Sequence, residues 1–350
     1  MTDKMETKLL SDSSEDIEIA AKILKSGGLV AFPTETVYGL GGDALLPEAS
    51  KKIYAAKGRP SDNPLIVHIA DVESVNDLAE EVPDKARLLM EAFWPGPLTI
   101  ILNKKAAVPK ETTGGLDTVA IRMPSHPAAA ELIRKSGVYI AAPSANTSGR
   151  PSPTTAEHVV DDLSGRIEAI IDGGPVGIGI ESTIVDMTGE IPTILRPGYI
   201  TKRMLEEIVG EVEIDKAIIE PDPALRPKAP GMKYTHYAPA GTLTIIEDEK
   251  YPDKVTENVI REINRLAAEK EKVAVLTTAD NAHLYKAENK VLLGEEANGK
   301  TVATRLYSAL RECDKLGVEY IYSESFDRDE LGGAIMNRLL KAAGHRVVKV

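Results

Sequence analysis

Short apolar runs alternate with amphipathic stretches along the first 210 residues. Strands are predicted where four or five apolar residues stand together, as at residues 29–32, 65–69 and 98–102. Helices are predicted where apolar residues recur at helical spacing and a glycine or proline ends the pattern, as at residues 17–26 and 47–56. Several strands follow one another without a helix between them. This order favours an α/β domain with a mixed sheet over a pure βαβ repeat.

The composition changes between residues 211 and 240, where prolines gather. We interpret this span as an ordered or semi-ordered linker. Beyond it, predicted strands at 243–246, 273–277 and 320–323 alternate with helices near 255–269, 301–316 and 330–343. The pattern therefore predicts three parts: a mixed-sheet α/β domain over 1–210, a linker over 211–240, and a smaller Rossmann-like α/β domain over 241–350.

Acidic residues exceed basic ones by 54 − 42 = 12, so the surface is acidic overall. A field of that sign does not attract nucleic acid, and any nucleotide or RNA site must be a local basic cluster. Aromatic residues make up only 4% of the chain, which predicts an aliphatic core. The single cysteine, Cys313, excludes an internal disulfide. It is predicted to lie within a helix between Glu312 and Asp314, which favours a structural cysteine over a nucleophile.

No stretch approaches the roughly 20 apolar residues that a membrane-spanning helix needs, and the first 15 residues lack the apolar region of a signal peptide. We therefore expect a cytoplasmic protein with no membrane partner. The chain also lacks a Walker A loop and a G-x-S-x-G elbow, and the glycines of 173–179 do not have dinucleotide-fingerprint spacing. The six histidines show no metal-ligand spacing, so no protein-held metal site is predicted.

Residues 57–68 combine features that suit a phosphate-bearing ligand. Lys57 and Arg59 stand at the end of a predicted helix, and Pro60 and Pro64 prevent that helix from continuing into the strand that follows. Arginine offers a planar fork and lysine a point charge for an anion. The alternative is that both cations are solvated helix-end residues favoured by the macrodipole.

Other predicted strands end in loops rich in hydroxyl and amide groups, and two strands carry an isolated arginine. Because ligands of open α/β sheets bind at the carboxyl ends of strands, we expect one shared anion site there. Structural pairing of the two arginines is the alternative. The residues concerned are Thr34, Thr36, Tyr38, Ser144, Asn146, Ser182, Arg122 and Arg196.

Four segments taken together resemble the YrdC-like threonylcarbamoyl-adenylate synthases. They are Pro-Thr-Glu-Thr-Val-Tyr-Gly-Leu at 33–40, Lys-Gly-Arg-Pro at 57–60 with Asn-Pro-Leu at 63–65, Pro-Ser-Ala-Asn at 143–146, and Glu-Ser-Thr-Ile at 181–184. The resemblance covers residues 17–209. The linker segment 230–239 and the second α/β domain resemble the longer, two-domain form of that family. The implied fold is a YrdC-like twisted mixed sheet with flanking helices, plus a smaller Rossmann-like C-terminal α/β domain.

The resemblance implies a nucleotidyltransferase that converts L-threonine, bicarbonate and ATP, with Mg²⁺, into threonylcarbamoyl-AMP and pyrophosphate. The product would pass to the machinery that forms threonylcarbamoyladenosine next to the anticodon of tRNA, and weak direct tRNA binding is a further expectation. Lys57 and Arg59 are implied to be catalytic through charge neutralisation. The implied ATP-binding residues are Arg59, Asn63, Thr118, Ser144, Asn146, Ser152, Arg196 and Tyr234, the last as a lid carried by the linker. The implied threonine-binding residues are Thr34, Thr36, Tyr38, His68, Arg122, Ala142 (through its backbone) and Ser182.

Two other functions compete with this interpretation. One is an RNA-binding module without catalysis, which the formal charge of −12 disfavours. The other is a carbamoyltransferase-type enzyme acting on carbamoyl phosphate, because YrdC-like domains also occur in such proteins. The absence of acylphosphatase-like and cysteine-rich zinc segments argues against it.

Overall fold

The computed structural model describes residues 5–219, 229–230, 237–295, 298–326 and 330–350. The chain divides into two compact units. The first comprises residues 1–148, 152–177 and 181–234, and the second comprises 149–151, 178–180 and 235–350.

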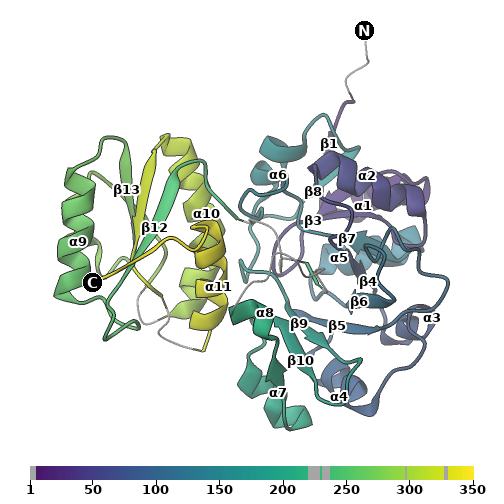
Figure 1. The fold of residues 1–350 in the computed structure, drawn as a ribbon. Coiled ribbons are helices and arrows are strands. Elements are labelled where there is room, and N and C mark those ends of the chain that lie inside the picture. Colours follow the sequence, from purple (N-terminus) through teal and green to yellow (C-terminus); the bar gives the residue numbers. More distant parts are fainter. Residues whose placement is uncertain (1–4, 220–228, 231–236, 296–297, 327–329) are drawn as a thin grey trace. The chain divides into compact units, whose positions relative to one another are not determined.

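The first unit contains strands and helices in mixed order (Figure 1). Its strands are β1 (Lys8–Ser11), β2 (Val30–Phe32), β3 (Gly39–Asp43), β4 (Ile66–His68), β5 (Leu98–Asn103), β6 (Thr118–Arg122), β7 (Ile140–Ala142), β8 (Ala169–Asp172), β9 (Thr183–Asp186), β10 (Thr193–Arg196) and β11 (Glu213–Ile214). Its helices are α1 (Ser14–Lys25), α2 (Pro47–Lys57), η1 (Val72–Ser74), α3 (Val75–Leu78), α4 (Asp84–Phe93), α5 (Pro127–Ser136), α6 (Ala156–Leu163), α7 (Lys202–Val209) and α8 (Lys216–Ile219).

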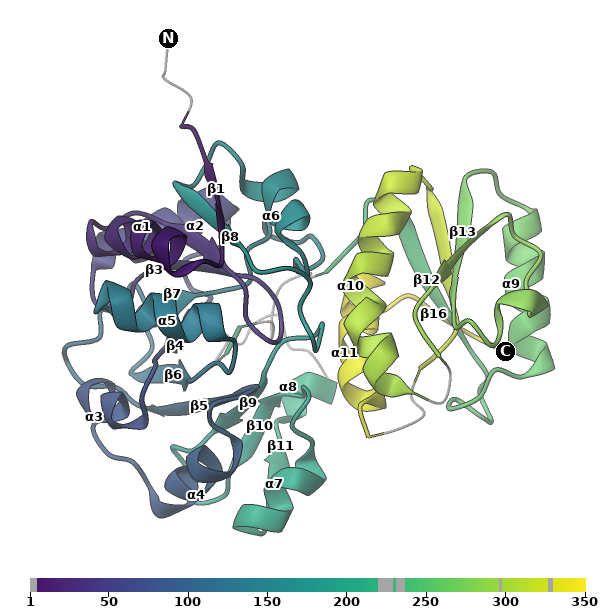
Figure 2. The ribbon, with the colours of Figure 1, turned by 180° about the vertical axis from the view of Figure 1, so that it is seen from behind.

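The strands of this unit form one mixed sheet in the order β1-β8-β2-β3-β7-β4-β6-β5-β9-β10-β11. β4 runs parallel to β6 but antiparallel to β7, so the predicted mixed sheet is present. Helices α1 and α5 lie side by side against one face (Figure 2). Alternate residues of β2 enter different hydrophobic clusters: Val30 and Phe32 pack with α1 and α5, whereas Ala31 packs with α2 and α4 on the other side. Both faces of the sheet are therefore covered.

Strand β3 corrects the predicted boundaries. The hydroxyl-rich loop predicted after the strand at 29–32 is expected from its glycines to continue to residue 42, but Gly39–Asp43 pairs with both β2 and β7. The glycines are needed because neighbours approach closely: a Cβ at Gly41 would lie 2.6 Å from Cγ2 of Ile140. The glycines that look like loop residues thus permit close packing between strands.

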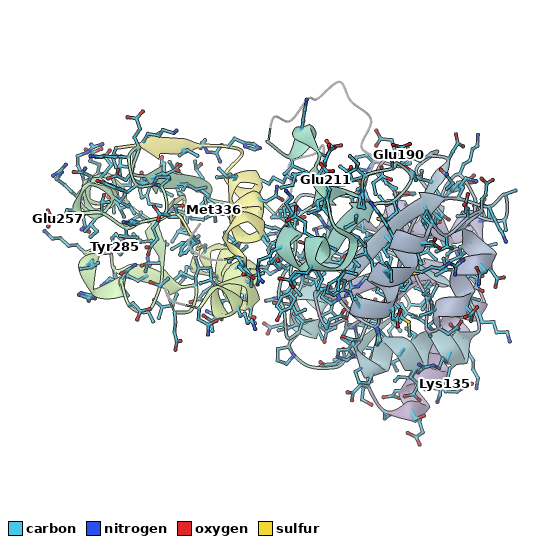
Figure 3. The ribbon with its side chains drawn as sticks, turned by 90° about the horizontal axis from the view of Figure 1, so that it is seen from below. Lys135, Glu190, Glu211, Glu257, Tyr285 and Met336 are labelled. Atoms are coloured by element: carbon cyan, nitrogen blue, oxygen red, sulfur yellow. The ribbon has the colours of Figure 1, made fainter. Side chains whose placement is uncertain are left out.

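The second unit is a separate α/β layer structure. Its strands are β12 (Thr242–Glu247), β13 (Val273–Thr277), β14 (Asn289–Leu292), β15 (Tyr320–Ser323) and β16 (Val347–Lys349), and its helices are α9 (Glu257–Ala268), η2 (Ala282–Leu284), α10 (Gly299–Leu316) and α11 (Gly332–Ala342). The sheet is parallel throughout, in the order β14-β13-β15-β12-β16. Helix α9 covers one face, and α10 and α11 lie on the other (Figure 1). Glu257 begins α9 at the outer side of this unit, whereas Tyr285 is buried inside it (Figure 3).

Cys313 is buried within α10, and burial, together with the adjacent Asp314 and Glu312, raises the pKa of its thiol to about 12, which fits a structural cysteine. Among the residues that the structure describes, no helix is both long and apolar enough to cross a membrane.

Candidate active site

Lys57 joins two motifs that lie far apart in the sequence. Helix α2 ends at Lys57 because Gly58 adopts a left-handed conformation with φ of 63°. The lysine side chain is buried, and its Nζ donates to the backbone carbonyls of Ser144 and Asn146. The interpretation of Lys57 as a solvated helix-end residue is therefore wrong. The Lys-x-Arg and Ser-x-Asn segments form one structure.

Arg59 shapes the turn that follows. Its Nε donates to the carbonyl of Asn63 at 3.3 Å, and its Nη2 donates to that of Pro64 at 3.1 Å. The side chain of Asn63 is buried, and its Oδ1 has no hydrogen-bond partner within the described residues. A buried amide oxygen in this state is an acceptor that suits a hydrogen-bond donor on a ligand.

Arg122 ends β6 in a buried position. Its Nε donates to the carbonyl of Gly96 at 3.3 Å, and its Nη1 donates to Oγ1 of Thr36 at 2.9 Å. Thr36 is linked to Thr34 at 2.9 Å between hydroxyl oxygens, and Thr34 donates to the carbonyl of Val37 at 2.6 Å. The loop after β2 is thereby held against the arginine.

Ser182 lies at a second junction at the same end of the strands. Arg196 donates to the Ser182 carbonyl from Nε at 3.1 Å and from Nη2 at 2.9 Å, and Nη2 is also 3.2 Å from Oγ. The Ser182 hydroxyl lies 2.7 Å from that of Thr99. The backbone of Gly198 passes so close that a Cβ there would lie 2.5 Å from the Thr183 nitrogen. The buried Ser182 hydroxyl is thus positioned by two neighbouring segments, one with Thr99 and one with Arg196 and Gly198.

His68 lies beside Arg122, and its imidazole ring is neutral. It ends β4 in register with Arg122, and its ring packs edge-on against Phe32 at 6.0 Å between centroids. Burial, with a further contribution from the charge of Arg122, lowers the pKa of His68 to about 3. Its Nδ1 lies 3.1 Å from the carbonyl of Ile66. A neutral imidazole beside a guanidinium can offer a lone pair without adding positive charge.

The candidate residues follow strands that run in opposite directions, so they do not all lie at one edge of the sheet. Because β7 is antiparallel to β4, Ser144 follows β7 at the end where β4 begins, whereas His68 and Arg122 lie at the opposite end. Thr118 begins β6 four residues before Arg122, a separation of about 13 Å along a strand. The loop after β2 connects the two ends, since Thr36 contacts Arg122 and the carbonyl of Tyr38 accepts from the nitrogen of Ala145 at 2.8 Å. The site is elongated and suits a ligand with two recognised ends.

The remaining predicted residues have defined neighbours, with one exception. Ser152 donates to Oε1 of Glu181 at 2.6 Å, next to Ser182 in sequence. Tyr38 donates to the carbonyl of Gly174 at 2.7 Å, and burial raises the pKa of its hydroxyl to about 12. Ala142 is buried at the end of β7. Tyr234 lies outside the described residues.

Comparison with known proteins decides the family. Residues 22–198 match the family described as "Telomere recombination", and residues 200–344 match the one described as "Threonylcarbamoyl-AMP synthase, C-terminal domain". The chain is 51% identical over 344 residues to the threonylcarbamoyl-AMP synthase of Bacillus subtilis, covering 98% of this chain and 97% of that protein. The chain belongs to the threonylcarbamoyl-AMP synthase family.

Further relatives of this family agree in sequence and in structure. The threonylcarbamoyl-AMP synthase of Pyrococcus abyssi is 48% identical over 336 residues, 95% of this chain and 96% of that protein. The solved structure of P. abyssi Sua5 complexed with L-threonine covers 98% of this chain and 99% of its own, with a TM-score of 0.90 and 46% identity. Escherichia coli YciO shares the fold over 56% of this chain and 96% of its own, with a TM-score of 0.50 and 24% identity. The predicted family and fold class are confirmed.

Within this member of the threonylcarbamoyl-AMP synthase family, sequence reasoning missed three side chains that contact the assigned ones. Thr99 touches Ser182, Glu181 touches Ser152, and Glu35 lies against Arg122. Two of them stand inside the quoted segments 33–40 and 181–184, so position in a motif was the available signal. Thr99 gave none, because a lone threonine in an apolar strand is ordinary.

Proposed function

We propose that this chain is a threonylcarbamoyl-AMP synthase that converts L-threonine, bicarbonate and ATP into threonylcarbamoyl-AMP and pyrophosphate. Relatives of that name align with almost the whole chain, and one of them has been solved with L-threonine. The structural observation that most supports the proposal is the burial of Lys57 against Ser144 and Asn146. It places a cation beside a turn rich in hydroxyl and amide groups, as nucleotide phosphates require.

The nucleotide is proposed to bind beside Lys57 and Arg59, where β4 and β6 begin, and to extend toward Ser152 and Arg196, which contact Glu181 and Ser182. Lys57 and Arg59 would neutralise phosphate charge there, and the unpartnered Oδ1 of Asn63 would accept a hydrogen bond from the nucleotide. Tyr234 is proposed as a lid over the nucleotide. The full proposed set is Arg59, Asn63, Thr118, Ser144, Asn146, Ser152, Arg196 and Tyr234.

Threonine is proposed to bind where β4 and β6 end. Arg122 and Ser182 would hold its carboxylate, because a buried guanidinium and a hydroxyl are matched donors for it. The neutral ring of His68 and the hydroxyl of Thr36 would take the polar side chain of the substrate. The full proposed set is Thr34, Thr36, Tyr38, His68, Arg122, Ala142 and Ser182.

The chemistry needs positioning and charge neutralisation more than a protein nucleophile. The amine of threonine and bicarbonate form a carbamate, and one carbamate oxygen attacks the α-phosphorus of ATP. The bond from that phosphorus to the bridging oxygen breaks, and pyrophosphate leaves. Because the carbamate is already anionic, fixed cations and a fixed approach geometry supply the acceleration.

Magnesium is proposed to enter with ATP. Among the described residues, no group of three or more histidine, cysteine or acidic side chains could hold a metal ion. Mg²⁺ keeps several waters and is commonly bound through substrate phosphates, so it would arrive as part of the nucleotide complex.

The product is proposed to serve tRNA modification in the cytoplasm. Threonylcarbamoyl-AMP would pass to the enzymes that transfer the threonylcarbamoyl group to adenosine next to the anticodon. Weak direct tRNA contact is part of the proposal, but the formal charge of −12 assigns it a minor role.

The experiment is a pyrophosphate-release assay in which threonine and bicarbonate are omitted in turn. Release that requires both supports the proposal, and Lys57→Ala should abolish it. Release without threonine would indicate a nucleotide hydrolase. No release from a folded protein, with salt-dependent RNA binding that ignores ATP, would favour the RNA-binding module.

A further inference from the structure

The residues assigned to threonine leave one of its charges without a counter-charge. An amino acid enters as a zwitterion, with a carboxylate and an ammonium group on one carbon. The assigned set contains a cation, Arg122, but no anionic side chain. Burying an ammonium group without a counter-charge is unfavourable, and the carbamate cannot form until that group has lost a proton.

Glu35 lies where such a counter-charge is needed. It stands between Thr34 and Thr36, and its side chain is only 14% exposed. Its Oε1 lies 2.6 Å from Nη2 of Arg122, while its Oε2 accepts from the backbone nitrogen of Ser125 at 3.2 Å. The carboxylate is therefore tethered on one side and directed at the arginine on the other.

The contact between Glu35 and Arg122 is close but poorly aligned. Oε1 of Glu35 and Nη2 of Arg122 are both buried, and neither makes a hydrogen bond of good geometry with any group that the structure describes. The two atoms form an ion pair but lack a well-directed hydrogen bond, which the ammonium and carboxylate groups of a ligand would supply. One acceptor and one donor, 2.6 Å apart, match the ammonium and carboxylate groups of a single α-amino acid.

We propose that Glu35 binds the ammonium group of threonine and accepts its proton, while Arg122 holds the carboxylate. This deepens the proposed function and rests on it. The ammonium gives one proton to Glu35, and its electron pair then forms the bond to the carbon of bicarbonate, from which water leaves. Threonine and bicarbonate together yield carbamate, water and one proton, so the step must discharge a proton. Glu35 passes it to solvent through its exposed fraction.

Two other roles for Glu35 make different predictions. Glu35 could be an internal competitor that occupies Arg122 until the substrate carboxylate displaces it. It could also be a purely structural residue that orients Arg122. Binding measurements separate the three roles because they depend on different groups of the substrate.

The experiment compares the unchanged protein with Glu35→Gln by calorimetric titration of threonine and of 2,3-dihydroxybutanoate, in which a hydroxyl replaces the ammonium group. Loss of one charge-assisted interaction should weaken threonine binding by about 10- to 100-fold and leave the analogue almost unaffected. Tighter binding of both ligands would establish the competitor, and equal weakening of both would establish the structural role. Either result, or no change, overturns the proposal.

A kinetic measurement tests the proton transfer. At saturating threonine, Glu35→Gln should lower kcat, and the deficit should shrink as pH rises and the amine deprotonates in solution. Glu35→Asp should keep the preference for threonine over the analogue, which keeps the test informative if Glu35→Gln folds poorly. Glu48→Gln removes one exposed carboxylate that pairs with Lys51 and is the matched control. It should change neither threonine binding nor kcat.

The outcomes also separate this inference from the proposed function. If the unchanged protein neither binds threonine nor releases pyrophosphate, the proposed function fails. If it does both and Glu35→Gln behaves identically, only the role of Glu35 fails.

Discussion

The neutral state of His68 makes the first unit sensitive to acid. The ring is buried between Phe32 and Arg122, and burial and the arginine charge together lower its pKa to about 3. In the unfolded chain the same side chain has a pKa of about 6.5. Below that value the unfolded state binds a proton that the native state does not, so the stability due to neutral His68 is lost as pH falls from 6.5 toward 3.

The expected size of the effect follows from the two pKa values. A pH of 5 is about 1.5 units below the pKa of the histidine in the unfolded chain. Each unit of that difference corresponds to about 1.4 kcal/mol of free energy. Native His68 remains neutral at that pH. Lowering the pH from 7 to 5 should therefore reduce the free energy of unfolding by about 2 kcal/mol through this one residue.

The assay is urea unfolding followed by the fluorescence of Trp94, which is the single tryptophan of the chain and is buried in the first unit. His68→Gln removes the titrating group, so the stability difference between the unchanged protein and the variant should shift by about 2 kcal/mol between pH 7 and pH 5. His283→Gln replaces an exposed histidine of the second unit and is the control. It shows how much a histidine-to-glutamine substitution at an exposed position changes the stability difference between pH 7 and pH 5. A difference that stays constant between the two pH values would refute the reasoning, because His68 would then titrate alike in both states.

Three further substitutions test the site. Lys57→Met should lower pyrophosphate release by at least about 100-fold and destabilise the first unit by about 1–3 kcal/mol in urea, because two buried carbonyls lose a charged donor. An active variant would remove Lys57 from the catalytic set. Ser182→Ala should raise the KM for threonine by about 10-fold with little change in kcat, and steady-state kinetics showing the reverse would place Ser182 in the chemical step. Gly198→Ala should destabilise the unit by about 1–3 kcal/mol and weaken threonine binding in calorimetry, because the new Cβ meets the backbone beside Ser182. Gly177→Ala, which has open space around it, is the control, and an equal effect at both positions would contradict the crowding argument.

The sequence determined those features that depend on local pattern. The helix at 47–56 and the strand at 273–277 follow from periodicity and turn residues, and the structure has them at Pro47–Lys57 and Val273–Thr277. The low aromatic content predicted the aliphatic core. The spaced motifs around Lys57 and Ser144 were sufficient to indicate the family, because four weak signals in one order are specific together.

Elements that depend on their neighbours were not predictable in this way. β1 and β16 lie at the edges of their sheets. The sequence of β3 resembles a loop because it is rich in glycine, and those glycines are needed for the close approach of β2 and β7. Their strand character comes from pairing, which a local pattern does not contain.

Only the tertiary structure decided which side chains meet. The direction of β7 relative to β4 separates Ser144 from His68, and the register of β4 with β6 places His68 beside Arg122. The loop after β2 brings Glu35 to Arg122 from 87 residues away in sequence, and Lys57 reaches Ser144 across the same number. Local sequence determines where a strongly patterned helix or strand lies. Strand direction and register, which arise from long-range pairing, determine its partners and therefore its chemistry.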